Sequence, residues 1–483
     1  MLFNSIDFLI FLPIVFFFYW FITKNSLKFQ NLLLLVASYY FYACWDWRFL
    51  FLLMFSTFLD YYTGLKMQNT TLISRKKFWF WLSIFINLGF LAVFKYYNFF
   101  AKSLVEGLNL LNIKANLTLI NVILPVGISF YTFHGLSYVI DIYKNRIKAE
   151  KNFTDYAVFV SFFPLLVAGP IERATHLLPQ IKKKREFDYY KAVDGLKQIL
   201  WGVFKKVVIA DNCAEIANEI FNNYGDYSGS SLVLGALCFT FQIYGDFSGY
   251  SDIALGTAKL FGIDLLRNFA FPYFSRDVAE FWRRWHISLS SWFKDYLYIP
   301  LGGSKGSMWI KIRNTFIIFI VSGFWHGANW TFIVWGLLNA IFIMPSIIFN
   351  TNRNNIEIVA KGANIPSFKD FLSIFFTFCL TVFAWIFFRS DNLKAAIVYV
   401  KNIFSITFFT IPKIQNVNNI SYTSIMVIFF LVIEWIGRED KYAIETFGKK
   451  YNKKYKYLFY YLIVFLIIYY GNFNKNQFIY FQF

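Results

Sequence analysis

The sequence has few charged residues and few cysteines. Only 16% of its 483 residues are Asp, Glu, Lys or Arg, whereas 58% are hydrophobic and 23% are aromatic. Soluble globular domains carry roughly a quarter charged residues, so this composition excludes an ordinary soluble protein. The four cysteines stand singly, with no C-x-x-C pair, at positions 44, 213, 238 and 379. Neither a metal site nor a disulfide framework is therefore expected.

The basic residues, although numerous, form no continuous surface. The formal net charge is +19, but Lys and Arg gather in short clusters between apolar runs, at 75–77, 182–185, 205–206 and 449–456. Nucleic-acid binding needs a continuous basic face, so no nucleic-acid partner is expected. Under the positive-inside rule the clusters are cytoplasmic, which predicts that both termini lie outside. No basic n-region and no small-residue cleavage site surround the first apolar run, which favours a retained helix over a signal peptide.

Long apolar runs recur along the chain and define its class. They occupy 8–22, 31–44, 49–62, 78–94, 158–167, 232–243, 315–325, 331–348, 371–388, 424–436 and 457–470. A full span needs roughly 20 apolar residues, and several runs are shorter, which indicates tilted, interrupted or re-entrant helices around a protein-lined interior. The prediction is an all-α polytopic membrane protein of about ten to twelve spans, forming one domain over residues 1–483 with lipid around it.

Four polar islands interrupt the apolar sequence, at 124–141, 163–173, 244–252 and 275–304. In the fourth island, apolar side chains repeat at helical spacing on one face and polar side chains on another: Phe281, Trp285, Leu289 and Trp292 against Arg284, Ser288 and Ser291. The pattern predicts an amphipathic or re-entrant helix at the cytoplasmic surface. An anchoring belt at the membrane interface is the alternative, because Trp and basic residues are common there.

His326 is the first functional candidate. It lies in SGFWHGANW (322–330), within a stretch that has no Asp, Glu, Lys or Arg between Arg313 and Arg353. A histidine inside a span is rare and is a functional hypothesis by default. Gly323 and Gly327 allow another backbone or a ligand to come close. The alternative is a buried histidine that holds neighbouring helix backbone.

Other polar residues have ordinary structural interpretations. His134 is expected to be a satisfied core histidine, and His176, beside a basic loop, an interfacial one. Asp246 and Asp252 either hydrogen-bond the backbone of broken helices or contact substrate.

Six segments, taken together, are specific. They are LPVGISFYTFHGLSYVIDIYK (124–144), FFPLLVAGPIER (162–173), GDFSGYSDIALG (245–256), NFAFPYFSRDVAEFWRRWHISLSSWFKDYLYIPLGG (268–303), SGFWHGANWTFIVWG (322–336) and FIYFQF (478–483). This combination resembles the membrane-bound O-acyltransferase superfamily, and within it the bacterial alginate O-acetyltransferase and peptidoglycan O-acetyltransferase A group. His134 stands where relatives often carry glutamine, and the 350–420 region matches poorly.

The resemblance implies that His326 is the superfamily's central histidine and that His286 is its second signature position. It also implies helices arranged around a central channel in the bacterial inner membrane. The channel would join a cytoplasmic acyl donor, acetyl-CoA, to an acceptor polysaccharide and a periplasmic O-acetyltransferase partner protein. No bound cofactor is expected.

The chemistry can be argued from the residues. Acyl transfer to a hydroxyl needs a base for the hydroxyl proton and stabilisation of the oxyanion. His326 suits the base, because burial disfavours its charged form. No G-x-S-x-G motif is visible, so direct transfer, or transfer through a carrier hydroxyl, is favoured over a serine acyl-enzyme. Arg283 and Arg284, with His286, are expected to meet the phosphates of the donor. Further candidates for donor or substrate contacts are Trp285, Trp325, Asn329, Asp246 and Ser248, with Lys294 and Lys305 as weaker ones.

The last six residues, FIYFQF, are mostly apolar, although chain ends are usually polar. One interpretation is a plug packed into the fold. The other is an acyl relay, suggested by similar terminal motifs in this branch, in which the Tyr480 hydroxyl accepts the acetyl group and passes it to a partner.

The function expected from these observations is acetylation of a cell-envelope polysaccharide. Peptidoglycan is the first choice of acceptor and alginate or another exopolysaccharide the second, with D-alanylation of teichoic acid third. A transporter or flippase for a lipid-linked sugar is the alternative from a different class.

Overall fold

The computed structural model describes residues 1–120, 123–166, 169–415, 420–447, 452–473 and 478–479, and no strand occurs in these ranges. The chain divides into two compact units. The first comprises Met1–Tyr189 with Ala258–Leu266, and the second comprises Tyr190–Thr257 with Arg267–Phe483. The predicted all-α class is confirmed, whereas the single domain over residues 1–483 stays a prediction.

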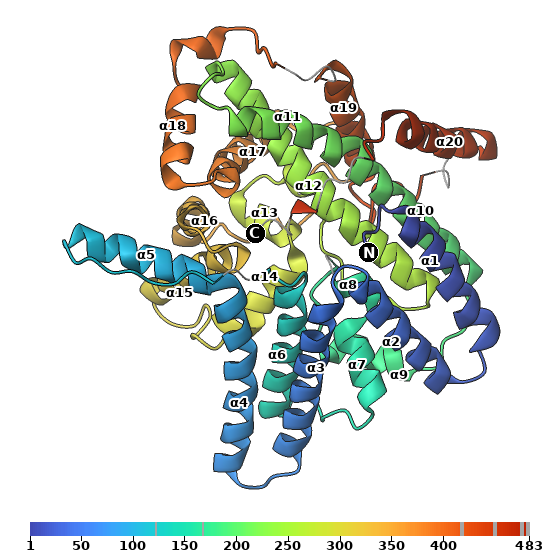
Figure 1. Cartoon of the computed structure of the whole chain (residues 1–483). Helices are drawn as coiled ribbons and strands as arrows, with labels where there is room; N and C mark the ends of the chain where they lie inside the picture. The colour runs from blue at the N-terminus through green and yellow to red at the C-terminus, as the bar shows by residue number, and fades with distance from the viewer. Residues whose placement is uncertain (121–122, 167–168, 416–419, 448–451, 474–477, 480–483) are drawn as a thin grey trace. The chain divides into compact units, whose positions relative to one another are not determined.

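The first unit contains α1 to α9. Their bounds are α1 Ile6–Phe17, η1 Phe18–Ile22, α2 Leu27–Ala43, α3 Trp47–Gln68, α4 Ile73–Leu91, η2 Ala92–Tyr96, α5 Tyr97–Leu110, α6 Ile128–Tyr143, α7 Phe153–Ser161, α8 Phe163–Leu166 and α9 Ala174–Lys182. Here α3, α4 and α6 pack side by side (Figure 1).

A buried carboxylate joins these three helices. Asp60 of α3 is 1% exposed, and its Oδ1 accepts hydrogen bonds from Ser83 Oγ at 2.6 Å and Asn87 Nδ2 at 2.8 Å, both on α4. A Cβ at Gly135 of α6 would lie 1.9 Å from Asp60 Oδ2. The glycine therefore makes room for the carboxylate, which is stable in an apolar setting because it is hydrogen-bonded.

His134 and His176 meet at Glu172. The buried His134 ring accepts a hydrogen bond from the Glu172 backbone N–H at Nε2, at 3.1 Å. The Glu172 carboxylate pairs with His176 Nδ1 at 2.8 Å and accepts the Leu266 amide at 2.6 Å. The expectation of a core role for His134 is confirmed, and His176 is half-exposed beside its carboxylate partner.

The second unit contains most of the remaining helices. Their bounds are α10 Tyr189–Phe204, η3 Lys205–Ala210, α11 Asp211–Asn222, α12 Gly229–Leu260, η4 Pro272–Phe274, α13 Val278–Arg284, α14 Ile287–Phe293, η5 Lys294–Tyr298, α15 Met308–His326, α16 Trp330–Ile348, α17 Phe368–Arg389, α18 Leu393–Ile403, η6 Ile406–Phe409, α19 Ile420–Ile436 and α20 Lys453–Tyr470. The end of α12, from Ala258, belongs to the first unit.

Four described helical stretches are long and apolar enough to cross a membrane: Ile73–Leu110, Gly229–Leu260, Trp330–Ile348 and Phe368–Arg389. The apolar runs found in the sequence fall in helices, but the one at 158–167 is divided between α7 and α8. These helices agree with a membrane protein. The count of about ten to twelve spans stays a prediction.

Candidate active site

His326 is the last residue of α15, and glycines bring this helix against α16. A Cβ at Gly323 would lie 2.2 Å from Phe332 O, and one at Gly336 would lie 2.3 Å from Phe319 O. Both glycines are therefore needed for the close approach of the two backbones. Of the two glycines flanking His326, Gly323 therefore makes room for the backbone of α16.

Aromatic rings surround His326, which is only 3% exposed. The ring centroid of Trp335 lies 5.1 Å from that of His326 with the planes at 89°, and the centroid of Phe388 lies at 5.4 Å. Trp325, the preceding residue, lies at 4.9 Å. These contacts fix the imidazole in place by packing, because the rings meet it edge to face.

His286 lies beside His326, with 6.4 Å between the ring centroids. The two histidines that the sequence singled out are therefore brought together in the second unit. His286 is fully buried, and the Phe247 ring of α12 packs against it at 4.6 Å. Its backbone has φ 44° and ψ 53°, in the left-handed region. For a residue with a Cβ this conformation costs about 1 kcal/mol or more, so surrounding contacts must hold it.

This conformation corrects the helix predicted for the fourth island. The helical spacing predicted one amphipathic helix, but α13 ends at Arg284 and α14 starts at Ile287, with His286 at the break. Arg284 and Ser288, expected on a polar face, are buried. The periodicity continued across a backbone turn that tertiary hydrogen bonds impose, and periodicity alone does not reveal such a turn.

Asn268 supplies those hydrogen bonds. No pattern in the sequence indicated this role. The backbone carbonyl of Asn268 accepts the Ile287 amide at 2.9 Å, and its Oδ1 lies 3.1 Å from His286 Nδ1. The same Oδ1 accepts from Ser288 Oγ at 2.9 Å, while Nδ2 donates to Ser251 Oγ at 3.2 Å. An amide oxygen only accepts, so the proton of His286 is on Nδ1 and Nε2 is the basic nitrogen of the ring.

Trp285 packs in the aromatic layer behind His286. It is 1% exposed, and its ring stacks on Phe281 at 5.5 Å and lies 5.2 Å from Trp385. A contact of Trp285 with substrate therefore stays a prediction, and the visible role of this ring is packing.

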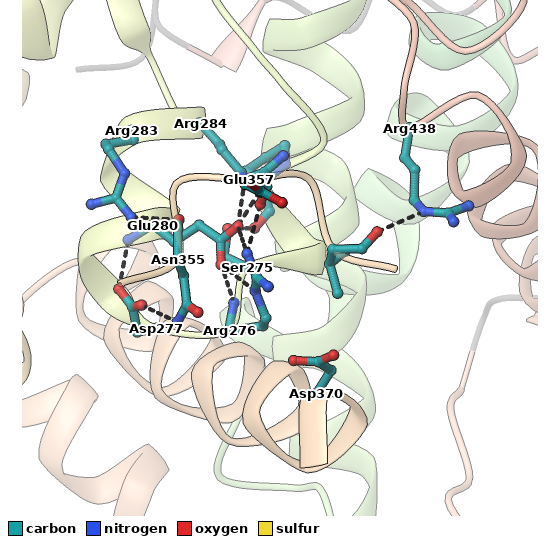
Figure 2. Close-up of polar contacts among 12 residues, drawn as sticks. Ser275, Arg276, Asp277, Glu280, Arg283, Arg284, Asn355, Glu357, Asp370 and Arg438 are labelled. Carbon is teal, nitrogen blue, oxygen red and sulfur yellow. Dashed lines mark hydrogen bonds and ion pairs between the residues drawn. The ribbon is translucent and has the colours of Figure 1, made fainter. Parts of the chain in front are cut away.

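Four arginines, here called the arginine cluster, lie on and near α13: Arg276, Arg283, Arg284 and Arg438. Glu280, 1% exposed, accepts from Arg284 Nη2 at 2.7 Å and from Arg276 Nε at 3.1 Å. Figure 2 shows this carboxylate between the two guanidinium groups. Removal of one partner from such a buried set leaves an uncompensated charge, so the cluster is a structural centre.

The cluster binds backbone carbonyl groups of the loop that joins α16 to α17, here called the 352–363 loop. Arg283 donates to Asn352 O at 2.6 Å and to Asn355 O at 2.9 Å. Arg276 donates to Glu357 O at 2.6 Å, and Arg438 donates to Val359 O at 3.0 Å and Ala360 O at 2.6 Å (Figure 2). Carbonyl groups occur at every residue, so this attachment depends little on the side chains of the loop.

Arg283 and Arg284, predicted to meet the donor, thus have partners within the chain. Arg284 is buried and also donates to Ala270 O at 3.2 Å, while Arg283 is exposed. Of the weaker candidates, Lys294 reaches Asp295 at 4.0 Å and Lys305 is exposed. Donor binding by these residues stays a prediction, and exposure favours Arg283 over Arg284.

Asp246 and Ser248 project from α12 to two neighbouring lysines of the π turn η3. Lys206 pairs with Asp246 at 2.7 Å, while Lys205 pairs with Asp252 at 2.6 Å and donates to Ser248 Oγ at 2.9 Å. A cavity of about 20 Å³ lies beside Lys205 and is also lined by Asn268, Ser251, Arg267 and Glu434. This volume has room for one water molecule and not for a donor.

The remaining predicted residues have different outcomes. Asn329 caps α16 by accepting from the Thr331 amide at 3.1 Å and donates to Asp391 O at 2.7 Å. Tyr480 lies outside the described residues, but Phe478 and Ile479 before it are buried. Among the residues that the structure describes, no group of three His, Cys, Asp or Glu has the arrangement of a metal site.

These observations define a class: an all-helical membrane enzyme whose two buried histidines adjoin in an aromatic pocket. The chain belongs to the membrane-bound O-acyltransferase family, whose family model matches residues 144–388. It is an acyltransferase of that family.

Three relatives illustrate the range within the family. The probable alginate O-acetylase of Pseudomonas aeruginosa is 37% identical over 448 residues, covering 92% of this chain and 82% of the relative. The peptidoglycan O-acetyltransferase of Helicobacter pylori is 37% identical over 431 residues, covering 83% and 79%. The teichoic acid D-alanyltransferase of Bacillus subtilis is 29% identical over 234 residues, covering 46% and 59%. The two O-acetylating relatives are equally similar, so identity does not distinguish their acceptors.

Proposed function

We propose that this enzyme transfers acetyl groups from acetyl-CoA on the cytoplasmic side of the inner membrane to a cell-envelope polysaccharide. The observation that carries the proposal is the pairing of His326 with His286 at 6.4 Å in a buried aromatic pocket. O-acetylating relatives that match over most of both chains support the acetyl group. Peptidoglycan is the first acceptor and an exopolysaccharide such as alginate the second. D-alanylation is third, because its named relative matches less than half of the chain.

In the proposed reaction His326 is the base. The acceptor hydroxyl attacks the thioester carbonyl carbon, and His326 takes the hydroxyl proton. The tetrahedral intermediate then collapses, the carbon–sulfur bond breaks, and the proton passes to the leaving thiolate. His286 donates its Nδ1–H to Asn268 Oδ1 and so presents Nε2 as a second basic nitrogen for this proton. Asn329, Trp325 and Ser248 remain proposed contacts to substrate, and a central channel remains the proposed route.

We further propose that Tyr480 serves as the relay. In that step the tyrosine oxygen takes the acetyl group and gives its proton to His326, and a serine of a periplasmic O-acetyltransferase partner then displaces the phenol. A phenol is a better leaving group than an alkoxide, so the second transfer is easy. The burial of Phe478 and Ile479 fits both the relay and the plug. Tyr480→Phe separates them, because it keeps the ring and removes only the hydroxyl: activity is lost in a relay and kept in a plug.

Ester-linked acetate tests the acceptor. A strain without this protein should lose acetate from purified muropeptides, while a complemented strain should regain it. If muropeptide acetate is unchanged and a secreted polymer loses acetate, the acceptor is an exopolysaccharide and not peptidoglycan. If neither changes and D-alanyl esters of teichoic acid disappear, the reaction is D-alanylation of teichoic acid. Transport of a lipid-linked sugar, the alternative from another class, gains no support from membership of an acyltransferase family.

A further inference from the structure

The C-terminal segment is held at two places in the second unit. At the end of α20, Tyr470 O accepts from Asn212 Nδ2 at 2.9 Å, and beyond the helix the Asn472 amide donates to Val207 O at 2.9 Å. Val207 lies in the π turn η3, where the bonding pattern of an α-helix is interrupted, and such turns are frequent at functional sites. The chain end is therefore attached to the element that carries Lys205 and Lys206.

The second place is at Phe478–Ile479. The Ile479 amide donates to Asp246 Oδ2 at 2.7 Å, and Ile479 is 1% exposed. The Phe478 ring, fully buried, packs on Tyr250 at 4.5 Å and on Phe247 at 6.0 Å. A terminal segment usually frays unless something ties it down. Here a buried carboxylate binds its backbone and two rings of α12 receive its side chain.

Lys206 holds that carboxylate. Its ammonium group lies 2.7 Å from Asp246 Oδ1 and 2.9 Å from Asp211 Oδ1, and all three side chains are at most 3% exposed. A buried carboxylate is stable only when paired and hydrogen-bonded, and a charged acceptor binds an amide more strongly than a neutral one. Asp246 thus uses one oxygen for Lys206 and the other for the chain end.

Phe478 lies near the histidines through a shared neighbour. The Phe247 ring contacts the Phe478 ring at 6.0 Å and the His286 ring at 4.6 Å. In the sequence, residue 480 follows Ile479 directly.

We propose that Lys206 and Asp246 form a seat for the C-terminal arm, defined here as Phe478 and Ile479: the charged pair binds the backbone of Ile479 and so holds these two residues next to Phe247, which packs on His286. The proposal rests on the acetyl transfer proposed above for its catalytic consequence. Both residues are positioning residues, because they act through the arm and not on the reacting atoms. Asp246, expected from the sequence to contact substrate, receives this role instead.

Carboxypeptidase digestion of the full-length protein in detergent tests the seat without reference to activity. Digestion of the wild type should not pass Ile479, as read by intact mass, because Phe478 and Ile479 are buried. Asp246→Leu should let digestion continue toward residue 473. Asp246→Asn keeps the shape and an acceptor oxygen, so it should fold, yet it should pass residue 478 about tenfold faster than wild type because the acceptor is neutral. Lys206→Met should act in the same direction.

The adjacent ion pair gives a matched control. Lys205 and Asp252 lie on the same two elements and pair at 2.6 Å, but they face the small cavity and not the arm. Lys205→Met and Asp252→Asn should leave the digestion limit as in wild type. The seat would be overturned if wild type, Asp246→Asn and Lys206→Met were digested equally. It would also be overturned if the variants of Lys205 and Asp252 were digested as far as the variants of Lys206 and Asp246.

Kinetics separates the seat from the reaction. An unseated arm should lower kcat at least about tenfold while leaving the KM for acetyl-CoA unchanged, because only a transition-state arrangement is lost. If Asp246→Asn raises the KM for acetyl-CoA and leaves kcat unchanged, Asp246 binds the donor and the proposal is overturned. If the wild type transfers no acetyl group, the proposed function fails, but the digestion limits still decide whether the seat exists.

Discussion

The arginine cluster takes Arg276, Arg283 and Arg284 from the polar island 275–304 and the histidine pocket takes His286 from it, yet the two regions use their polar groups in opposite ways. In the cluster, four guanidinium groups bind Glu280 and the carbonyls of the 352–363 loop. In the pocket, aromatic rings pack around His286 and His326, and one amide, Asn268, orients the first of them. The charged residues of the island thus hold the chain, whereas the two histidines are enclosed by rings, where we propose that they exchange protons.

The largest expected effect is on the stability of the cluster. Glu280→Ala removes the carboxylate that neutralises Arg276 and Arg284, which should cost about 3–5 kcal/mol because the buried Arg284 and the half-buried Arg276 lose their partner. Thermal unfolding in detergent measures it, with Arg283→Ala as the control, since Arg283 is exposed and donates to the carbonyls of Asn352 and Asn355. Equal unfolding temperatures for the two variants would remove the structural role of Glu280.

The second effect concerns the pocket and is read as a rate, measured on the fraction of protein that remains folded. Asn268→Leu removes the acceptor for His286 Nδ1, which should lower kcat about 10- to 100-fold, the equivalent of one buried hydrogen bond. Asn268→Asp retains an acceptor at the same place and should recover part of the rate. If Asn268→Leu and Asn268→Asp are equally slow, the contact to His286 is not what matters.

The third effect tests whether the cluster also serves the donor. Arg283→Ala should raise the KM for acetyl-CoA about tenfold if its exposed guanidinium meets a phosphate. A short acetyl thioester without phosphates gives the control, because its KM should not change. If the KM for both donors is unchanged, Arg283 does not bind the donor and its role is to attach the 352–363 loop.

The smallest effect comes from an ion pair near water in the first unit. The hydrogen bond from Glu172 raises the pKa of His176 above its usual value, despite some opposing burial. A raised pKa means that the pair stabilises the fold below about pH 6.5 and that this contribution is lost as pH rises through the raised pKa. The difference in unfolding temperature between wild type and His176→Gln, followed from about pH 5.5 to pH 9, should shrink as pH rises. A difference independent of pH would contradict the pairing.

Much of this arrangement could be predicted from the sequence. Apolar runs gave the all-α class, and the two histidines that the motifs singled out lie together in one pocket. The break at His286 could not be predicted, because helical spacing continues on both sides of it. Asn268 was missed for a related reason: an amide 18 residues away from His286 gains its role only through tertiary contact. Glu280 was quoted within its segment without a role, and Lys206 was counted among the basic clusters of cytoplasmic loops although it is buried in η3. Burial of a charge is not visible in a sequence.

Acetyl transfer by His326→Gln in proteoliposomes tests the central claim most directly. Glutamine is similar in size but is not a base, so the rate of acetyl transfer from acetyl-CoA should fall about 10²- to 10⁴-fold while the protein remains folded. His134→Gln is the matched control, because His134 is also a buried histidine, and its contact, an accepted hydrogen bond from the Glu172 amide, can be made by a glutamine oxygen. If His326 is the base, His134→Gln should transfer acetyl groups at a near wild-type rate and His326→Gln should show almost no transfer. A wild-type rate in His326→Gln would contradict the role of His326 as the base.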